Sequence, residues 1–368
     1  MCSVGSVREA VFTNLMKAVT GLKIVKLQHP HLEEWFVTAP ANAREKCHRY
    51  VHDAGGVIVA EDLFGITGSA KSDWPVTWLR GNPTLTGVHL HAVQGVPVER
   101  LTFSGRVVGS VFADGAVRHC RLGGLRPATM SESPAGQARA TFELLEAALR
   151  DAGMTFANVA RTWFYLNNIL AWYGEFNRVR DEFFRKRSVF DGLVPASTGI
   201  GGANIDGTAL VAGAYAVTGG QLTAVPSPLQ CPALQYGSSF SRAVELKTTD
   251  HSRLWISGTA SIAPGGETVH VGDGVGQIAL TMRVVAAILE SRGLSWSDTT
   301  RAIAYVREAA LARQFHEYQS ANGLTDLPVV TTENVICRDD LLFEIELDAG
   351  RITAAKSQSE SAGRTRWG

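Results

Sequence analysis

The chain has 368 residues, of which 45% are hydrophobic and 19% are charged, a composition typical of a soluble globular protein. Lys plus Arg and Asp plus Glu both number 35, so the formal net charge is zero. Proteins that bind nucleic acid or anionic membranes rely on a basic surface, so this balance argues against both classes. It favours an enzyme that acts on a small molecule, or a self-associating protein.

Residues 1–95 show little similarity to the rest of the chain, and we expect them to form an N-terminal extension. Arg8 and Lys17 interrupt the apolar residues of the first segment, unlike a signal peptide, and no later apolar run approaches the length of a membrane span. The five cysteines are scattered, without a CxxC pair, so neither a disulfide framework nor a zinc site is indicated. His89 and His91 have no third ligand at a metal-binding spacing. We therefore expect a reduced, cytoplasmic protein.

The remainder of the chain contains a duplicated module, because similar segments recur in the same order. "LTFSG" at Leu101–Gly105 is similar to "LWISG" at Leu254–Gly258. An offset of 140 then relates Gln137–Gly153 to Gln277–Gly293, Arg161 to Arg301, and Tyr165 to Tyr305, and an offset of 133 relates the segments from Pro195 and Pro328.

Each copy predicts the same order of elements, β-β-α-β-α-β-β. The long helix ends at Gly153 or Gly293, suited to the left-handed C-cap position, and the second helix lies near Phe176–Phe184 or Ala309–Ser320. This order predicts an α+β fold with two tandem modules, each a mixed sheet with both helices on one face. The expected divisions are an extension at 1–95, modules at 96–218 and 236–352, a linker at 219–235, and a disordered tail at 353–368.

The run "ICRDDLLFEIELDA" (Ile336–Ala349) places two carboxylates, Glu344 and Glu346, in an otherwise apolar strand. Burying a carboxylate is costly unless it is paired or kept neutral. We interpret the run as a hairpin with its turn at Asp339–Asp340, because "DG" occupies the matching site of the first copy. On this register Cys337 is a diagonal neighbour of Glu344, roughly 5–8 Å away between Cβ atoms.

The repeat makes this pair asymmetric. The offset of 133 places Val211 at the position of Glu344 and Asn204 at that of Cys337, so the acid and the thiol occur only in the second module. On the neighbouring strands one face carries Arg301, Ile303, Tyr305 and Arg307, matched by Arg161, Trp163 and Tyr165 in the first module. Because arginine binds carboxylates bidentately, this face predicts a pocket for a small anionic substrate.

These residues resemble a known family. The module order, with its Arg-bearing strand and final "FEIE" strand, is similar to the RidA/YjgF-like (chorismate-mutase-like) fold. Over residues 95–350, two such modules resemble the chorismatases in the stretches "RTWFYLNNILAWYGEFNRVRDEFF", "PASTGIGG", "YGSSFSRAVEL", "SGTASIAP" and "ICRDDLLFEIE".

The resemblance implies a lyase that cleaves chorismate and releases pyruvate, with no metal or organic cofactor. It implies that Glu344 protonates the enolpyruvyl methylene, which requires a carboxyl whose pKa is raised by desolvation. Face position suggests Arg161 and Arg307 as carboxylate clamps and Tyr165 and Tyr305 as hydroxyl donors. Cys337 and Gly237 resemble the aromatising branch, which forms 3-hydroxybenzoate for secondary metabolism, and Cys337 would assist the ring rearrangement.

Alternatives remain open at this point. The product could instead be 3,4-dihydroxycyclohexa-1,5-diene carboxylate or 4-hydroxybenzoate, or the protein could be a RidA-type enamine/imine deaminase or a non-catalytic binder of aromatic acids. Glu344 could form a surface salt bridge, Cys337 could be a buried small hydrophobe, and the strand arginines could be structural. Single-module relatives are typically trimers, so the chain is expected to be a homo-oligomer, a trimer for example, or a pseudo-oligomeric monomer. The role of Glu346 stays unassigned.

Overall fold

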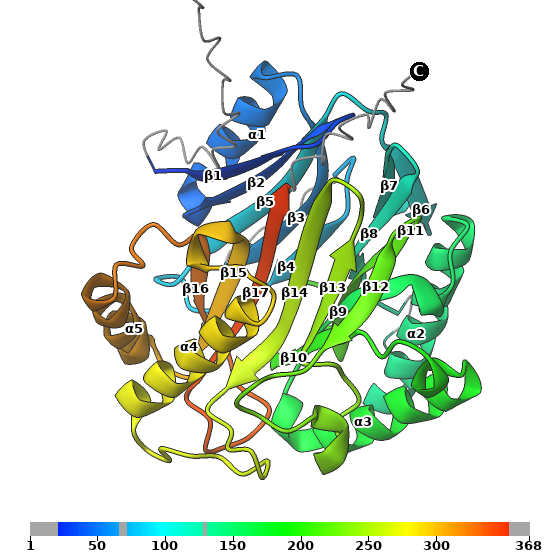
Figure 1. Ribbon diagram of the computed structural model, residues 1–368. Helices are drawn as coiled ribbons and strands as arrows, with labels where there is room; N and C mark the ends of the chain where they lie inside the picture. The colour runs from blue at the N-terminus through cyan, green and yellow to red at the C-terminus, as the bar shows by residue number, and fades with distance from the viewer. Residues whose placement is uncertain (1–20, 66–71, 128–129, 131, 353–368) are drawn as a thin grey trace, which may run out of the picture.

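Three mixed β-sheets, with helices around their outside, make up the protein in the computed structural model (Figure 1). The structure describes residues 21–65, 72–127, 130 and 132–352. The expected tail at 353–368 lies outside the described residues. Among the described helices, none is long and apolar enough to cross a membrane.

The first sheet has five strands in the order β1-β2-β5-β3-β4 and is covered by one helix. Its helix, α1 (Arg44–Asp53), packs Cys47 and Val51 against the sheet. The strands are β1 (Lys23–Gln28), β2 (Glu33–Ala39), β3 (Val57–Phe64), β4 (Val76–Leu79) and β5 (Gly87–Gln94). The segment expected as an N-terminal extension therefore contains a sheet of its own. We accordingly number this segment as the first module, residues 96–218 as the second and residues 219–352 as the third.

The second sheet has six strands in the order β10-β9-β11-β8-β7-β6. The strands are β6 (Glu99–Phe103), β7 (Arg106–Asp114), β8 (Val117–Leu125), β9 (Val159–Leu166), β10 (Ala196–Gly201) and β11 (Leu210–Thr218). Its helices are α2 (Pro134–Asp151) and α3 (Ile169–Lys186). Both pack on one face of the sheet, as the sequence predicts, in a core rich in phenylalanine.

The third sheet repeats this plan in the order β12-β13-β14-β17-β15-β16. The strands are β12 (Gln221–Val225), β13 (Ala243–Lys247), β14 (His251–Ala260), β15 (Thr299–Val306), β16 (Val329–Glu333) and β17 (Phe343–Ile352). Its helices are α4 (Gly274–Glu290) and α5 (Ala309–Ala321). Short 3-10 helices connect elements of the chain: η1 (Ala41–Ala43), η2 (Phe156–Asn158), η3 (Val189–Asp191), η4 (Ala233–Tyr236) and η5 (Trp296–Asp298).

The duplicated helices begin and end as their sequences predict. Ser133 and Asp273 cap α2 and α4 by accepting a hydrogen bond from the backbone N–H three residues later. After the helices, Gly153 and Gly293 take φ values of 72° and 69°, the left-handed conformation that glycine adopts without a steric penalty.

The expected final hairpin is wrong. β16 and β17 do not pair with each other, because β15 lies between them, parallel to β16 and antiparallel to β17. The two strands are joined by a loop over residues 334–342, so Cys337 is a loop residue and not a cross-strand neighbour of Glu344. The same crossover occurs in the second sheet, where β9 lies between β10 and β11.

Two further expectations differ from the structure. The segment expected as a linker contains β12, which pairs with β13, so the third sheet begins within it. The similar segments "LTFSG" and "LWISG" do not lie on equivalent strands, because Leu101 lies on β6 and Leu254 lies on β14. Since β8 and β14 both pair with the last strand of their sheets, the counterpart of β14 is β8.

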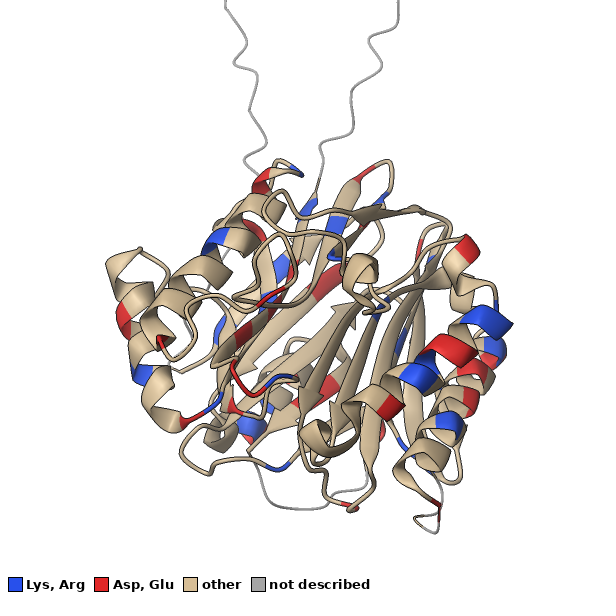
Figure 2. Cartoon of the chain, turned by 90° about the horizontal axis from the view of Figure 1, so that it is seen from below, with Lys and Arg blue, Asp and Glu red and all other residues tan. Residues whose placement is uncertain are grey.

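The inner faces of the three sheets meet in a shared core. This core contains Phe64 from the first sheet, Tyr165 and Val211 from the second, and Trp255 and Tyr305 from the third. Charged residues lie along the strands as well as on the surrounding helices (Figure 2). A protein interior of this kind must pair its charges, and the pairs determine where a reactive group can lie.

Candidate active site

The final strand presents three acids, Glu344, Glu346 and Asp348, to the centre of the molecule. Phe343, Ile345 and Leu347 on β17 pack in the core under α4 and α5, so Glu344 and Glu346 point to the opposite side. The alternation predicted from the sequence is confirmed, and both carboxyl groups are buried. Their surroundings, however, are very different.

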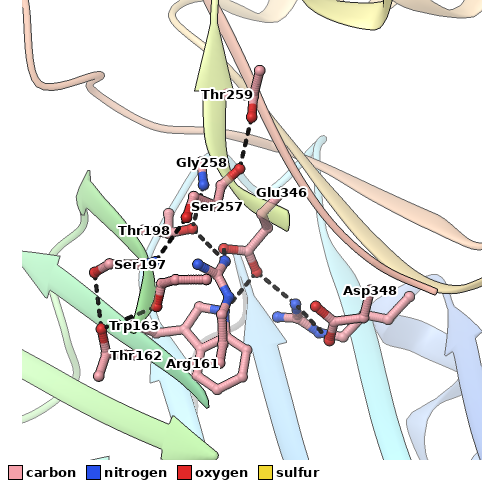
Figure 3. A network of polar contacts seen from close by, with 12 residues as sticks. Arg161, Thr162, Trp163, Ser197, Thr198, Ser257, Gly258, Thr259, Glu346 and Asp348 are labelled. Carbon is pink, nitrogen blue, oxygen red and sulfur yellow. Dashed lines mark hydrogen bonds and ion pairs between the residues drawn. The ribbon is translucent and has the colours of Figure 1, made fainter. Parts of the chain in front are cut away.

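Glu346 is fully paired (Figure 3). It accepts hydrogen bonds from Arg301 at 2.6 Å, Arg161 at 2.9 Å and the indole N–H of Trp163 at 2.9 Å. Burial opposes ionisation of Glu346, but Arg301 and Arg161 outweigh it, so the pKa of this carboxyl is lowered. Glu346 is thus a buried carboxylate paired with two arginines from different sheets, a role left open by the sequence.

Glu344 has no hydrogen-bond or ion-pair partner among the described residues. Its Oε1 lies over Gly258 of β14, where an added Cβ would come within 2.0 Å of this oxygen. Burial and then the negative charge of Glu346 raise the pKa of Glu344 to about 8, although Arg161 partly opposes the shift. At neutral pH Glu344 is therefore a protonated carboxylic acid, able to donate a proton.

The equivalent positions of the other sheets carry no acid. Glu344 pairs with Tyr305 across β17 and β15, Val211 pairs with Tyr165 across β11 and β9, and Gly87 pairs with Phe64 across β5 and β3. The correspondence of Glu344 with Val211, inferred from the sequence offset, is confirmed by this pairing. One of three similar inner faces therefore has an acid at this level.

Glu344 lies where the second and third sheets meet. The edge strand β10 runs beside β14, and the backbone N–H of Gly258 donates to Thr198 Oγ1 at 3.0 Å. The backbone N–H of Ser197 donates to Ser257 Oγ at 2.9 Å (Figure 3). These contacts fix Gly258 beneath the acid and bring residues of the second module to the acid of the third.

The thiol of Cys337 lies near this junction although the predicted hairpin does not form. Its side chain packs against the core of the second module and against the core shared by the three sheets. Burial and the proximity of Glu344 raise the pKa of Cys337 to about 12, so the group is a neutral thiol at physiological pH. It can donate a proton but does not act as a thiolate nucleophile.

Several polar residues near Cys337 were not predicted from the sequence. Arg180 and Tyr173 come from α3 of the second module, and the Tyr173 hydroxyl lies over Gly199 on β10. Tyr236 and Arg242 come from the segment between β12 and β13, and the Arg242 guanidinium lies 5.4 Å from the centre of the Tyr236 ring. All four lie in stretches that resemble the chorismatases, but nothing within either stretch marks them as site residues, because they come together only when two modules pack.

Arg180 and Arg242 are unusual because both are buried without a described carboxylate in ion-pair distance. Nε of Arg180 and Nη2 of Arg242 have no hydrogen-bond partner among the described residues. Burial lowers the pKa of Arg180, with Tyr173 and Asp181 opposing the shift. Buried guanidinium groups with free N–H donors are suited to bind an anion from outside the chain.

The remaining predicted site residues have other positions. Tyr165 and Tyr305 are buried in the shared core with their hydroxyl oxygens 3.4 Å apart. Arg307 lies at the end of β15, where it donates to the Arg338 carbonyl at 3.2 Å and to Asp339 at 3.3 Å. Gly237 follows η4 with a left-handed φ of 84°, next to Tyr236.

Similarity to known proteins agrees with this arrangement. A sequence profile described as Endoribonuclease L-PSP matches residues 123–216, within the second module. A crystal structure of a chorismatase matches with 21% identity and a TM-score of 0.61, over 79% of this chain and 92% of that chain.

Smaller proteins match one module each. A putative endoribonuclease from Thermotoga maritima matches with 21% identity and a TM-score of 0.29, over 35% of this chain and 97% of that chain. Escherichia coli TdcF, solved with bound serine, matches with 20% identity and a TM-score of 0.29, over 35% and 98%. Among curated protein sequences, none matches significantly. The profile match and the chorismatase match show an α+β fold with RidA/YjgF-like modules, and the overall fold is that of a chorismatase.

Proposed function

We propose that the protein is an enzyme that cleaves chorismate and releases pyruvate, with Glu344 as the acid. The observation that carries the proposal is a buried carboxyl group, unpaired among the described residues, with a pKa of about 8. Protonation of an enol ether at carbon needs an acid that is still protonated near neutrality, which an ordinary glutamate is not.

The chemistry proceeds from this proton. Glu344 transfers it to the methylene carbon of the enolpyruvyl ether, which becomes an oxocarbenium ion. The ring C3–O bond then breaks, its electrons form the ketone of pyruvate, and the ring carbon accepts an oxygen nucleophile. If the nucleophile is the 4-hydroxyl of the ring, its proton returns to the Glu344 carboxylate, and an epoxide-like intermediate forms and rearranges to 3-hydroxybenzoate, without net consumption of water. If it is water, the product is the dihydroxycyclohexadiene carboxylate.

Substrate binding requires two cationic groups, because chorismate is a dicarboxylate. Arg180 and Arg242 support this requirement, since each is buried and keeps a nitrogen without a protein partner in the described chain. Arg161 is engaged with Glu346, so we assign it to setting the charge around Glu344. Arg307 is half-buried and lies on a separate cavity of about 310 Å³.

We favour the aromatising branch, with 3-hydroxybenzoate as the product. The neutral thiol of Cys337, next to an equally neutral Glu344, supports it because both groups can donate and accept a proton during opening of the epoxide and aromatisation. Gly237 takes a left-handed φ of 84° next to Tyr236, a conformation that favours glycine at this position.

The test is to incubate the purified protein with chorismate and to separate the products by chromatography while pyruvate is measured enzymatically. We expect equal amounts of pyruvate and 3-hydroxybenzoate. If the dihydroxycyclohexadiene carboxylate (the diene diol) forms instead of 3-hydroxybenzoate, the enzyme is a chorismate hydrolase and the aromatising reaction is wrong. If no pyruvate forms, the whole proposal is refuted.

Glu344→Gln tests the assigned acid. Loss of general acid catalysis should lower kcat by about 10²–10⁴-fold. Glu317→Gln on the exposed face of α5 is the matched control and should leave kcat unchanged. In the unsubstituted enzyme kcat/KM should fall as pH rises through about 8, because Glu344 then loses its proton. A rate that stays constant from pH 6 to pH 9 would contradict the assignment.

A further inference from the structure

Three equivalent hairpin turns, one from each sheet, meet at the end of the molecule away from Glu344. They are the β1–β2, β7–β8 and β13–β14 turns, because β2, β8 and β14 each pair with the last strand of their sheet. On β14, His251 lies opposite Ile352 whereas Ala260 lies opposite Glu344, so the length of the strand separates the turns from the acid.

Each turn contributes one buried residue to a common cluster. His29 follows β1, Asp114 ends β7, and His251 begins β14. Each offers one ligand atom, and these three atoms all lie within 4.8 Å of one another. Nδ1 of His29 is 3.0 Å from Oδ2 of Asp114, and the two imidazole rings have centroids 4.6 Å apart. Among the described residues this is the one such cluster of three.

The polar atoms of the cluster have unmet hydrogen-bonding capacity. Both ring nitrogens of His29, both carboxylate oxygens of Asp114 and Nε2 of His251 are buried without a hydrogen-bond partner of suitable geometry in the described chain. All three residues are at least nine-tenths buried. Orphaned buried polar atoms on three converging residues are rare in proteins and call for an additional bonding partner.

We propose that His29, Asp114 and His251 bind a divalent transition-metal ion, for which Zn²⁺ is the best match. Two imidazole nitrogens and one carboxylate oxygen form a common three-ligand set for zinc, whereas Mg²⁺ and Ca²⁺ prefer oxygen ligands throughout. The ligand atoms need to approach one another only slightly to surround one ion, because atoms bound to the same zinc lie roughly 3–3.5 Å apart.

The groups behind the histidines support this assignment. Nδ1 of His251 lies 2.9 Å from Thr248 Oγ1, 3.2 Å from Asp250 Oδ1 and 4.0 Å from Oδ2 of Asp114, whereas Nε2 has no hydrogen-bond partner in the described chain. Nε2 of His29 lies 3.4 Å from Oε2 of Glu34, which leaves Nδ1 for the metal. Metal-bound histidines in proteins commonly direct their second nitrogen at a carboxylate in this way.

The cluster borders a solvent-filled depression. A cavity of about 850 Å³ is lined by Asp114, by the turns at Gly115 and Gly219, and by Thr248 and Asp250. The cavity gives an ion a route of entry and gives water access to the remaining coordination position. An ion held by all three turns would tie the three sheets together at the end opposite to the acid.

The test uses the full-length, tag-free chain, stripped with a chelator and then titrated with Zn²⁺ against a chromophoric competitor. We expect one equivalent of Zn²⁺ per chain, a higher melting temperature with Zn²⁺ than with chelator, and, with Co²⁺ as a spectroscopic probe, ligand-field bands of an N₂O site. His251→Gln and Asp114→Asn should weaken binding more than the roughly 10–100-fold typical of outer-sphere changes.

Two further variants keep the result interpretable. His52→Gln removes a histidine whose side chain is 89% exposed and should leave the affinity unchanged. Asp250→Asn alters only the group behind His251, so it should fold and should weaken binding by about 10–100-fold. Less than one equivalent of bound Zn²⁺, or an unchanged Zn²⁺ affinity in Asp114→Asn, would overturn the proposal. The cluster would then be explained by a protonated His29 that shares its protons with Asp114 and Glu34.

Discussion

The second and third modules have the same backbone arrangement at Val211 and Glu344, but the first residue is part of an apolar core and the second is a candidate catalytic acid. Val211 pairs with Tyr165, and Glu344 pairs with Tyr305, at corresponding places in the two sheets. Val211 belongs to the shared apolar core, whereas Glu344 faces Gly258 and the edge strand of the second module. The fold thus provides a repeated position, and side-chain chemistry makes one copy of it reactive.

The comparison extends one step along the strand. Gly213 lies across from Trp163 in the second sheet, where Glu346 lies across from Ile303 in the third. Glu346 forms ion pairs with Arg161 of the second module and with Arg301 of the third. The negative charge of Glu346 is therefore balanced in part by an arginine of another module. The second module, which has no acid of its own at this level, therefore supplies part of the electrostatic environment of Glu344.

The largest loss of stability should come from Glu346→Gln, which removes the charge from this position, as Gly213 does in the second module. Removing one partner of a buried ion pair typically costs about 3–5 kcal/mol, because the remaining charge stays buried. Arg301 keeps Asp62 at 3.3 Å, whereas Arg161 keeps only neutral partners among the described residues. Denaturant unfolding measures the loss, and Glu317→Gln serves as the control, expected to change stability by less than about 0.5 kcal/mol.

Glu346→Gln should also shift the pH dependence of any remaining activity. The charge of Glu346 helps to raise the pKa of Glu344, so its removal should lower that pKa and move the alkaline loss of kcat/KM to lower pH. An unshifted profile in a folded variant would show that burial alone sets the acidity of Glu344.

Glu344→Gln should stabilise the protein at alkaline pH. The pKa of Glu344 is raised to about 8 in the folded state from 4.5, so the folded protein binds the proton more tightly than the unfolded chain. The stability that this group contributes is therefore complete below about pH 4.5 and is lost as pH rises through about 8. The variant should gain up to about 5 kcal/mol over the native protein by pH 9, at about 1.4 kcal/mol for each pKa unit.

Measurement of unfolding free energy at pH 5, 7 and 9 checks this expectation. The difference between Glu344→Gln and the native protein should grow with pH, whereas Glu317→Gln should follow the native curve at all three values. A difference in unfolding free energy that stays constant with pH would mean that Glu344 ionises normally. Glu344 would then not be the unusual acid that distinguishes the third module from the second, which has Val211 at this position.

The sequence predicted what depends on short-range pattern. Alternation along β15 and β17 placed Tyr305, Glu344 and Glu346 on the inner face, and a constant offset identified Val211 as the counterpart of Glu344. Both are confirmed, since strand periodicity and a common ancestor leave local traces. The predicted hairpin failed because two strands adjacent in sequence are separated by β15, and strand order is a long-range property.

The missed site residues have a related explanation. Arg180 and Arg242 reach the region of Glu344 and Cys337 from a helix of one module and a connection of the next, so no periodicity within either segment marks them. The first sheet escaped detection because its sequence shows little similarity to the other modules and it has fewer strands and helices than they have. The composition of the site therefore depends on how the modules pack together, and residue patterns within one segment of the sequence do not contain that information.

Gly258→Ala should have a smaller effect that tests the position of the acid. An added Cβ would lie 2.0 Å from Oε1 of Glu344, so the carboxyl must move. A displacement of about 1 Å can lower a rate by about 100-fold, and the strain should cost about 1–3 kcal/mol. Gly174→Ala in α3 is the control, because its Cβ would enter open space and should not reduce activity. Equal rates for the two variants would show that Glu344 need not lie over Gly258.

The smallest effect is expected for Cys337→Ala, which removes the thiol that the second module replaces with Asn204. The thiol is neutral, with a pKa of about 12, so its loss removes a proton donor and acceptor without altering the charge around Glu344. Pyruvate release should therefore change by less than about tenfold, equivalent to less than about 1.4 kcal/mol of barrier, while the product shifts from 3-hydroxybenzoate toward the diene diol. Chromatography of both products measures the ratio. An unchanged ratio with native pyruvate release would leave Glu344 as the single group that separates the reactive module from its counterpart.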